Sequence, residues 1–401
     1  MKIAICMMKC LDVGYGSVKS AVTLANEFAK RGYDVSFVCY DKPGGRLEFP
    51  LDPRVKFRNL ATFEPRNSLR VLRAVVKVLY NVPSFLPVFL YERIAALLYS
   101  IRCYILNSFA PFWSWHWLLH NRRYDVVSIH GSDAIAVIPL AVQKKWSKLV
   151  ITLHSMPKAE IEMFSFGRIP SIMKRIGLGR ADTITVLQKE FIEQTYVYCR
   201  YHNKKRIVCI PNIIYESTKT RERRLGKHVN FIAVGSLVKE KNFDILIEAL
   251  SLIDYKEWSC NIWGQDSGEM SNLRELIARL NLDQFVFLRG FSNEIEQEID
   301  KADFIVQPSY FEGFPLAVAE AMTMGVVPIG FASCPGINNL IEDSVNGLLV
   351  VGNNALDLSR AIETILRNPN LYKYLSRNAI KSMQKYTPQS VMPKWEQIIN
   401  E

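Results

Sequence analysis

The chain of 401 residues is long enough for two or three ordinary domains with sizeable cores, and its 49% hydrophobic and 22% charged residues exclude a disordered protein. The formal net charge of +11 is unevenly placed. Residues 1–210 hold 31 basic and 15 acidic side chains, a net charge of +16. Residues 211–401 hold 19 basic and 24 acidic side chains, a net charge of −5. The basic half predicts an anionic membrane surface and a phosphorylated, anionic substrate as partners, and no zinc-finger, RRM or KH signature indicates nucleic acid.

Cysteine usage predicts a reducing compartment. The eight cysteines are irregularly spaced, and none belongs to a C-x-x-C pair that would indicate zinc. A disulfide framework is not expected in a chain of this length, so we interpret them as reduced thiols of a cytoplasmic protein. Residues 1–8 are too short for the apolar region of a signal peptide.

The first residues predict a βαβ unit. Residues 2–8 form an apolar run typical of a buried parallel strand, residues 18–31 have a helical period, and residues 35–39 form a second strand. The glycine loop after the first strand lies where open α/β sheets bind ligands. Gly14 and Gly16 do not fit G-x-G-x-x-G, which disfavours a dinucleotide.

Residues 68–123 alternate basic side chains with apolar and aromatic runs. Residues 103–121 carry no formal charge if histidine is neutral, and they hold six aromatic Tyr, Phe and Trp side chains. Their polar residues and a proline disfavour a transmembrane helix, which needs about twenty apolar residues. Two interpretations remain open: an element lying in the membrane interface, or helices packed on the sheet of the N-terminal half.

Alternating strands and helices follow, and they predict parallel sheets with right-handed crossovers. The expected strands are residues 126–130, 149–153, 183–187, 207–210, 230–234, 259–263, 285–288, 304–307, 326–329 and 347–351. The expected C-terminal helices are residues 355–367, 371–385 and 389–400. The polar, charged run 216–227 predicts a linker between two α/β units. His130 and His154 each end a predicted strand.

A strand, a glycine loop and a helix surround residues 308–325. The strand 304–307 leads to Glu312 and Gly313, and Pro315 suits the first helical position, where its missing N–H costs nothing. Residues 317–324 are strong helix formers, and Gly325 can end the helix. The helix N-terminus predicts a phosphate site, with N–H groups supplied by Phe314, Leu316 and Ala317.

Glu312 and Glu320, with seven residues between them, resemble the E-x7-E signature of retaining glycosyltransferases with the GT-B fold, family 4. In that family the first Glu contacts the donor sugar and the second binds the ribose hydroxyls of the nucleotide. The resemblance implies an α/β protein with two Rossmann-like domains facing across a cleft. It implies an acceptor-side domain of residues 1–212, a nucleotide-sugar domain of residues 228–387, and a last helix, residues 388–401, packed back on the first domain through Trp395.

Other positions match family motifs. The sequence from Gly235 to Phe243 resembles the G-R-L-x-x-x-K-[GN] loop that holds the donor diphosphate, with Ser236 at the position of the arginine and Lys241 at that of the lysine. The run ending at His154 resembles the strand whose terminal histidine reaches the donor phosphate and sugar. The resemblance implies Glu312 and His154 as catalytic residues, on opposite domains that close together. It implies donor contacts from Gly16, Ser236, Lys241, Arg289, Gly313, Phe314, Pro315, Leu316 and Glu320.

The implied activity is transfer of a hexosyl group, with retention, from a nucleotide diphosphate donor, expected to be a UDP-sugar. The acceptor is expected to be a hydroxyl of a glycan, lipid-linked or surface-polysaccharide precursor such as lipopolysaccharide. No D-x-D pattern near a strand end indicates a metal, and none is expected to be required. The enzyme is expected on the inner face of the membrane, as a peripheral cytoplasmic protein. A UDP-sugar epimerase or phosphorylase on the same fold, and a non-catalytic nucleotide-sugar-binding subunit, remain alternatives.

Overall fold

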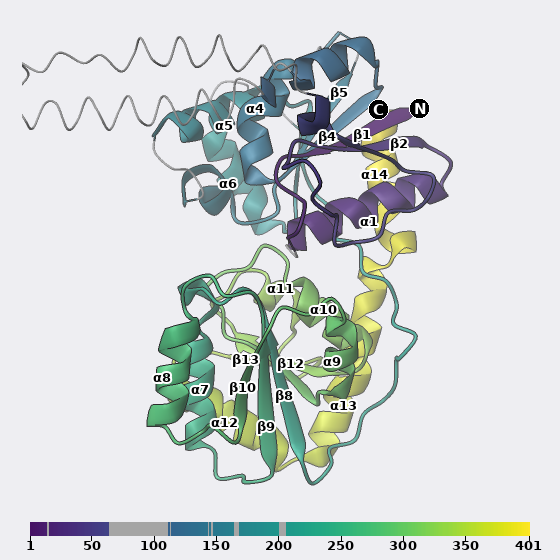
Figure 1. Cartoon of the computed structure of the whole chain (residues 1–401). Coiled ribbons are helices and arrows are strands. Elements are labelled where there is room, and N and C mark those ends of the chain that lie inside the picture. The colour runs from purple at the N-terminus through teal and green to yellow at the C-terminus, as the bar shows by residue number, and fades with distance from the viewer. Residues whose placement is uncertain are drawn as a thin grey trace, which may run out of the picture. The chain divides into compact units, whose positions relative to one another are not determined.

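The computed structural model describes residues 1–13, 16–63, 111–112, 114–142, 144–145, 147–163, 168–199 and 206–401 (Figure 1). The chain divides into two compact units. Unit 1 is Met1–Cys209 together with Gln397–Glu401, and unit 2 is Ile210–Glu396. Each unit is built on a parallel sheet with helices, which confirms the predicted α/β class and the two Rossmann-like domains.

Unit 1 contains a seven-stranded sheet in the order β3-β2-β1-β4-β5-β6-β7. The strands are β1 (Lys2–Met7), β2 (Asp34–Cys39), β3 (Lys56–Asn59), β4 (Val126–His130), β5 (Lys148–Thr152), β6 (Thr183–Val186) and β7 (Arg206–Cys209). All the recorded pairings are parallel, and β1, β4 and β5 form the buried centre. The sequence pattern missed β3, because two of its four residues are basic and its burial is incomplete.

The described helices of unit 1 are α1 (Gly16–Lys30), α4 (Ser132–Ala141), α5 (Arg168–Arg180) and α6 (Glu190–Tyr198), with short helical turns at Leu60–Phe63 and Ala159–Met163. Helix α1 buries Val18, Val22 and Phe28 on one face, as its period predicts. Helices α4 and α5 approach closely at Gly177, where any Cβ atom would overlap the carbonyl oxygen of Ile135.

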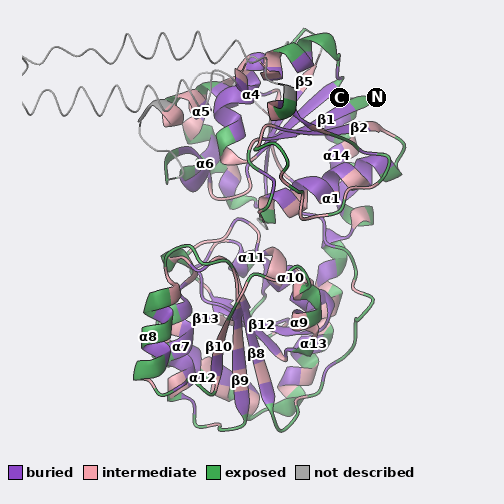
Figure 2. Cartoon of the chain, in the orientation of Figure 1, coloured by how far each residue is buried: buried purple, intermediate pink, exposed green. Residues whose placement is uncertain are grey.

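Unit 2 contains a six-stranded sheet in the order β10-β9-β8-β11-β12-β13. The strands are β8 (Val229–Val234), β9 (Trp258–Trp263), β10 (Val286–Gly290), β11 (Phe304–Gln307), β12 (Val327–Phe331) and β13 (Leu348–Val350). Their apolar side chains form the core, in which the ring of Phe304 lies 5.4 Å from that of Phe231 and 5.1 Å from that of Tyr372. Figure 2 shows these strands buried between helices that have exposed outer faces.

The helices of unit 2 cover both faces of this sheet, with α7, α8 and α12 on one face and α9, α10 and α13 on the other (Figure 1). They are α7 (Phe243–Leu252), α8 (Met270–Arg279), α9 (Ile295–Lys301), α10 (Leu316–Thr323), α11 (Ile337–Leu340), α12 (Ala355–Leu366), α13 (Pro369–Ser382) and α14 (Pro388–Asn400), with short turns η3 (Lys239–Lys241) and η4 (Met383–Tyr386). The end of α14 belongs to unit 1, where Lys148 Nζ donates to the carbonyl of Ile398 and Arg206 pairs with Glu401.

The segment predicted to be a linker has no regular secondary structure, but it is not simply solvated. The Arg223 side chain is only 6% exposed. Its guanidinium donates to the carbonyls of Met324, Asp300 and Ala302, at 3.0, 2.9 and 2.7 Å. Arg223 therefore ties the segment to the carboxyl-terminal ends of α9 and α10.

Most of the basic and aromatic stretch predicted between residues 68 and 123 lies outside the described residues, and so does Trp113. Residues 114–121 are helical, with Trp115 fully buried and Trp117 61% exposed. One face of this short helix therefore packs into unit 1 while Trp117 lies at the surface. Among the described helices, none is both long and apolar enough to cross a membrane.

Candidate active site

Two loops at the carboxyl ends of β8 and β11 are tied together in unit 2. Asn242, which ends η3 in a left-handed conformation with φ 51°, donates from Nδ2 to the carbonyl of Pro308 at 2.8 Å. The N–H of Tyr310 donates to the carbonyl of Glu240 at 2.9 Å. These two bonds join segments about seventy residues apart in the chain. They fix the loop before α7 beside the loop before α10.

This junction brings together two of the residues predicted for the site. Lys241 Nζ lies 2.6 Å from Glu312 Oε1, and the two side chains are only 22% and 12% exposed. An ion pair withdrawn from water in this way is screened less than a surface pair. Removing either partner would leave a partly buried charge without its nearest counterion.

Two further side chains donate to the same carboxylate oxygen. Ser309 Oγ donates to Glu312 Oε1 at 2.9 Å, and Gln307 Nε2 donates to Ser309 Oγ at 2.8 Å and to Glu312 Oε1 at 3.3 Å. With the Lys241 ammonium, three donors therefore converge on one oxygen of the Glu312 carboxylate. The sequence pattern did not single out Gln307, although a glutamine at the end of an apolar strand is a signal that could have found it.

Close packing of glycines shapes the loop that carries Ser236. The N–H of Gly235 donates to the carbonyl of Trp263 at 2.9 Å, and the N–H of Gly264 donates to that of Gly290 at 2.8 Å. A Cβ atom on Gly264 would overlap the carbonyl of Gly235. Gly264 is therefore required where the ends of three strands converge. Ser236 is partly exposed there, next to Gly235.

Helix α10 follows the Glu312 loop and begins one residue later than predicted. Pro315 is the residue before the helix, with φ −74° and ψ 90°, and its carbonyl accepts from the N–H of Ala319 at 3.1 Å. The prediction that Pro315 occupies the first helical position is therefore wrong, since its ψ is extended. Gly313 and Pro315 are buried, whereas Phe314 and Leu316 are partly exposed. Glu320 lies on α10 and is partly exposed, and Gly325 follows the helix with φ 76°, as expected.

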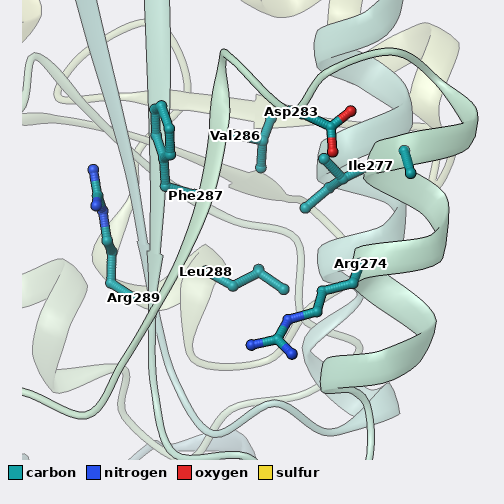
Figure 3. A pocket seen from close by; sticks show the side chains of 8 residues that line it. Arg274, Ile277, Asp283, Val286, Phe287, Leu288 and Arg289 are labelled. Atoms are coloured by element: carbon teal, nitrogen blue, oxygen red, sulfur yellow. The ribbon is translucent and has the colours of Figure 1, made fainter.

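Arg289 lies on β10, where its side chain is exposed. Its Nε donates to Asn261 Oδ1 at 2.7 Å, and its guanidinium lies 4.5 Å from the ring centre of Phe287. Arg289 also lines an open pocket of about 450 Å³ beside α8. Figure 3 shows Phe287 and Arg289 on one side of β10, and Leu288 on the side of Arg274 and Ile277 of α8. The pocket therefore lies at an edge of the unit, apart from the Lys241–Glu312 pair.

In unit 1, the predicted residue Gly16 is exposed and begins α1, while Gly14 and Tyr15 lie outside the described residues. The loop between β1 and α1 is held by Asp41, whose Oδ2 accepts from the N–H groups of Cys10 and Leu11 at 2.7 Å each. Asp41 was not predicted, because it lies in a different loop of the chain.

His154 follows β5 and contacts His130, the last residue of β4. His130 Nδ1 lies 2.9 Å from His154 Nε2, and His130 Nε2 lies 2.9 Å from Ser128 Oγ. His130 is 1% exposed and both of its ring nitrogens are engaged, so it does not present a ring nitrogen to a ligand. Of the two histidines that end predicted strands, His154 therefore stays the candidate ligand contact, and its role remains a prediction.

A buried carboxyl supports the backbone at His154. Glu160 Oε1 accepts from the N–H of His154 at 3.0 Å, and the carbonyl of Glu160 accepts from Lys174 Nζ at 2.9 Å. Burial raises the pKa of Glu160 to about 7. Burial also lowers the pKa of His154 to about 4 and that of His130 well below its usual value. Both imidazoles are therefore neutral at pH 7. Sequence reasoning missed Glu160 and Lys174, since each lies in a segment without a motif.

Comparison with known proteins gives this geometry a family. The profile described as "Glycosyltransferase Family 4" matches residues 15–217, about half of the chain, and the profile "Glycosyl transferases group 1" matches residues 216–382. An uncharacterized glycosyltransferase of Haemophilus influenzae is 23% identical over 402 residues, covering 99% of each chain. The amylovoran biosynthesis glycosyltransferase AmsD of Erwinia amylovora is 22% identical, covering 96% of each.

The fold also resembles solved structures. The crystal structure of a mutant of S. aureus TarM in complex with Fondaparinux, alpha-GlcNAc-glycerol and UDP aligns with a TM-score of 0.76 at 16% identity. The alignment covers 99% of this chain and 100% of TarM, which confirms the GT-B fold. Together with the family profiles, it shows that the chain belongs to glycosyltransferase family 4, with the GT-B fold.

Proposed function

We propose that the protein is a retaining hexosyltransferase that uses a UDP-sugar. The observation that carries the proposal is the Lys241–Glu312 pair, 2.6 Å apart at the carboxyl ends of β8 and β11. These are the residues that the family's motifs assign to the donor diphosphate and the donor sugar. Their loops are tied by the Asn242 and Tyr310 hydrogen bonds, which hold the two residues side by side.

The proposed step is a displacement at the anomeric carbon. The acceptor oxygen forms a bond to that carbon on the face from which the nucleotide diphosphate leaves, and the bond to the diphosphate oxygen breaks. The acceptor proton passes to an oxygen of the leaving phosphate. Lys241 stabilises charge on that phosphate, and the ionised Glu312 faces the sugar. Support for retention comes from the alpha-GlcNAc-glycerol and UDP named for the TarM complex, because common UDP-sugar donors are themselves α-linked.

The proposed reaction does not require a metal. Lys241 supplies one positive charge, and the N-terminal N–H groups of α10, including those of Leu316 and Ala317, add partial positive charge. Ser236 leaves the site one cation short of the family pattern, so we expect Lys241 to contribute a larger share of the donor affinity. Activity that persists in EDTA would agree with this proposal, and activity that returns only with added Mg²⁺ or Mn²⁺ would contradict it.

We further propose that the acceptor is a lipid-linked or surface-polysaccharide precursor at the inner face of the membrane. The relative AmsD is named for biosynthesis of amylovoran, which supports a polysaccharide acceptor. The +16 charge of residues 1–210 and the exposed Trp117 support peripheral attachment to an anionic bilayer.

The testing experiment has two stages. A thermal-shift panel of nucleotide sugars identifies the donor, since a ligand at a hundred times its dissociation constant adds about 2.7 kcal/mol of stability. An NMR spectrum of the first product formed with that donor then gives its anomeric configuration. Retention supports the proposal, and inversion contradicts it. Nucleotide release that depends on added acceptor separates a transferase from an epimerase, and absence of turnover would indicate a binding subunit.

A further inference from the structure

Three side chains at the ends of β4 and β5 form a hydrogen-bonded row in unit 1. Ser128, His130 and His154 are joined by contacts of 2.9 Å, first from Ser128 Oγ to His130 Nε2 and then from His130 Nδ1 to His154 Nε2. Ser128 and His130 are 2% and 1% exposed. The row ends at His154 Nδ1, a buried atom with no hydrogen-bond partner among the described residues.

The number of protons in this row is fixed. Burial lowers the pKa of both histidines, so each ring is neutral at pH 7 and carries one N–H. One proton must lie between His130 Nδ1 and His154 Nε2, because two N–H groups or two lone pairs would repel. The row therefore has two possible states, with both rings protonated at Nδ1 or both at Nε2.

Counting unsatisfied groups separates the two states. If both rings carry the proton at Nε2, the hydroxyl hydrogen of Ser128 has no acceptor among the described residues, and the lone pair of His154 Nδ1 has no donor there. If both carry it at Nδ1, Ser128 donates to His130, His130 donates to His154, and the N–H at His154 Nδ1 is the one group in the row left unsatisfied. Each state therefore leaves one buried donor without an acceptor, but the Nε2–H state also leaves the buried lone pair of His154 Nδ1 without a donor. Because each buried polar group left unpaired costs free energy, the Nδ1–H state is favoured.

We propose that Ser128 and His130 are positioning residues that hold His154 in the Nδ1–H form. When donor binding gives access to this buried atom, His154 presents a hydrogen-bond donor at Nδ1 to an acceptor oxygen of the nucleotide-sugar donor. The part concerning the ligand rests on the proposed transfer from a nucleotide sugar and on the role that the family resemblance implies for His154. A fixed donor suits an oxygen that carries or develops negative charge, whereas a lone pair at the same atom would repel it. Glu160 Oε1 accepts from the backbone N–H of His154 at 3.0 Å, and this bond holds the backbone of His154 in place.

Nitrogen-15 NMR of the full-length protein at pH 7.5 tests the tautomer without reference to activity. The chain has six histidines, so single replacements assign the ring signals. We expect a protonated Nδ1 and an unprotonated Nε2 in both His130 and His154. Ser128→Ala removes the hydroxyl that donates to His130 Nε2. We expect both histidines of this variant to populate the Nδ1–H and the Nε2–H tautomers. A protonated Nε2 in wild-type His154 would overturn the inference.

Kinetics then test positioning with a matched pair of variants. His130→Leu removes the donor to His154, and we expect kcat/KM to fall about 10- to 100-fold. His130→Asn keeps an amide N–H near the position of Nδ1 and is expected to recover most of that loss. Equal kcat/KM in His130→Leu and wild type, with unchanged His154 signals, would overturn the positioning role. If His154→Ala keeps wild-type kcat/KM while the tautomer is as expected, the role of His154 toward the donor is wrong and the tautomer assignment stands.

Discussion

At the scale of single residues, Glu312 and Lys241 neutralise each other's charge. The ammonium and the carboxylate oxygen are 2.6 Å apart, and both side chains are largely withdrawn from water. A bound diphosphate would therefore compete with Glu312 for the charge of Lys241. The effects of replacing the two residues should differ in sign on nucleotide binding.

Replacing Glu312 is expected to separate turnover from binding. Glu312→Gln removes the carboxylate that faces the sugar, and we expect kcat to fall about 100-fold or more. Binding of UDP, measured by calorimetry, should be unchanged or tighter, because Lys241 loses its competing anion. The neighbouring, exposed Glu240→Gln serves as control and should behave as wild type. Normal turnover with weaker UDP binding in Glu312→Gln would contradict this role.

Replacing Lys241 or Glu320 is expected to weaken donor binding. Lys241→Ala removes the charge assigned to the diphosphate, and Glu320→Ala removes the carboxylate assigned to ribose. Each should raise the dissociation constant of UDP about tenfold or more, since hydrogen bonds to charged groups contribute about 1.5–3 kcal/mol. Lys239→Ala, an exposed lysine two residues away, is the matched control. An unchanged dissociation constant in both variants would show that the donor binds elsewhere.

Replacing Glu160 is expected to change how stability depends on pH. Its folded pKa of about 7 lies above the ordinary value of 4.5, so the folded protein binds the extra proton and loses stability as pH rises from 4.5 to 7. Glu160→Gln is neutral and keeps an oxygen for the N–H of His154. We expect the free energy of unfolding of this variant to exceed that of wild type by at most about 3 kcal/mol at pH 8, and by much less at pH 4.5. A difference in melting temperature that is the same at both pH values would contradict the raised pKa.

At the scale of elements, strand positions followed from sequence and loop contacts did not. The predicted bounds of β4 and β11 match the structure, because buried parallel strands form continuous apolar runs bounded by polar residues. The site residues Lys241 and Glu312 came from motif resemblance. The donors Gln307 and Ser309 lie within five residues of Glu312, and their contacts depend on the conformation of the Glu312 loop. The Lys241–Glu312 contact and the Ser128–His130–His154 row depend on which strands lie side by side. Local residue patterns carry no direct record of that order.

The convergence of strand ends at Gly264 gives a prediction about packing. Gly264→Ala would force its Cβ against the carbonyl of Gly235, which is backbone and cannot turn aside. We expect a loss of about 1–3 kcal/mol in unfolding free energy and weaker UDP binding, because the Ser236 loop must shift. Gly179→Ala in α5 has open space around the added methyl and should be neutral or stabilising. Equal melting temperatures for the two variants would contradict this packing.

At the scale of the whole molecule, charge is divided between the halves of the sequence. Residues 1–210 carry +16 and the others carry −5. Each basic residue near an anionic bilayer contributes about 1 kcal/mol, and Trp favours the interface. The division therefore predicts attachment through unit 1, although residues 64–110 lie outside the described part of the chain.

Liposome sedimentation tests the attachment. We expect the protein to pellet with vesicles that contain anionic lipid at low salt, and to be released as salt is raised. Trp117→Ala should weaken binding without loss of fold, because this side chain is 61% exposed. Tyr374→Ala, a 51% exposed aromatic side chain of unit 2, is the control. If the protein stays in the supernatant at low salt, the predicted attachment through unit 1 is wrong, and the basic and aromatic residues 68–123 are ordinary protein surface and core.

The discontinuity of unit 1 has a consequence for synthesis on the ribosome. Unit 2 is one continuous segment, Ile210–Glu396, and unit 1 includes Gln397–Glu401, which is translated after it. The carbonyl of Ile398 and the carboxylate of Glu401, which serve Lys148 and Arg206, therefore leave the exit tunnel only after the whole of unit 2 has been made. The first half of the chain is therefore translated first but gains its last contacts only after those of unit 2 have been translated. Unit 1 is therefore the part of this enzyme that begins first on the ribosome and is completed last.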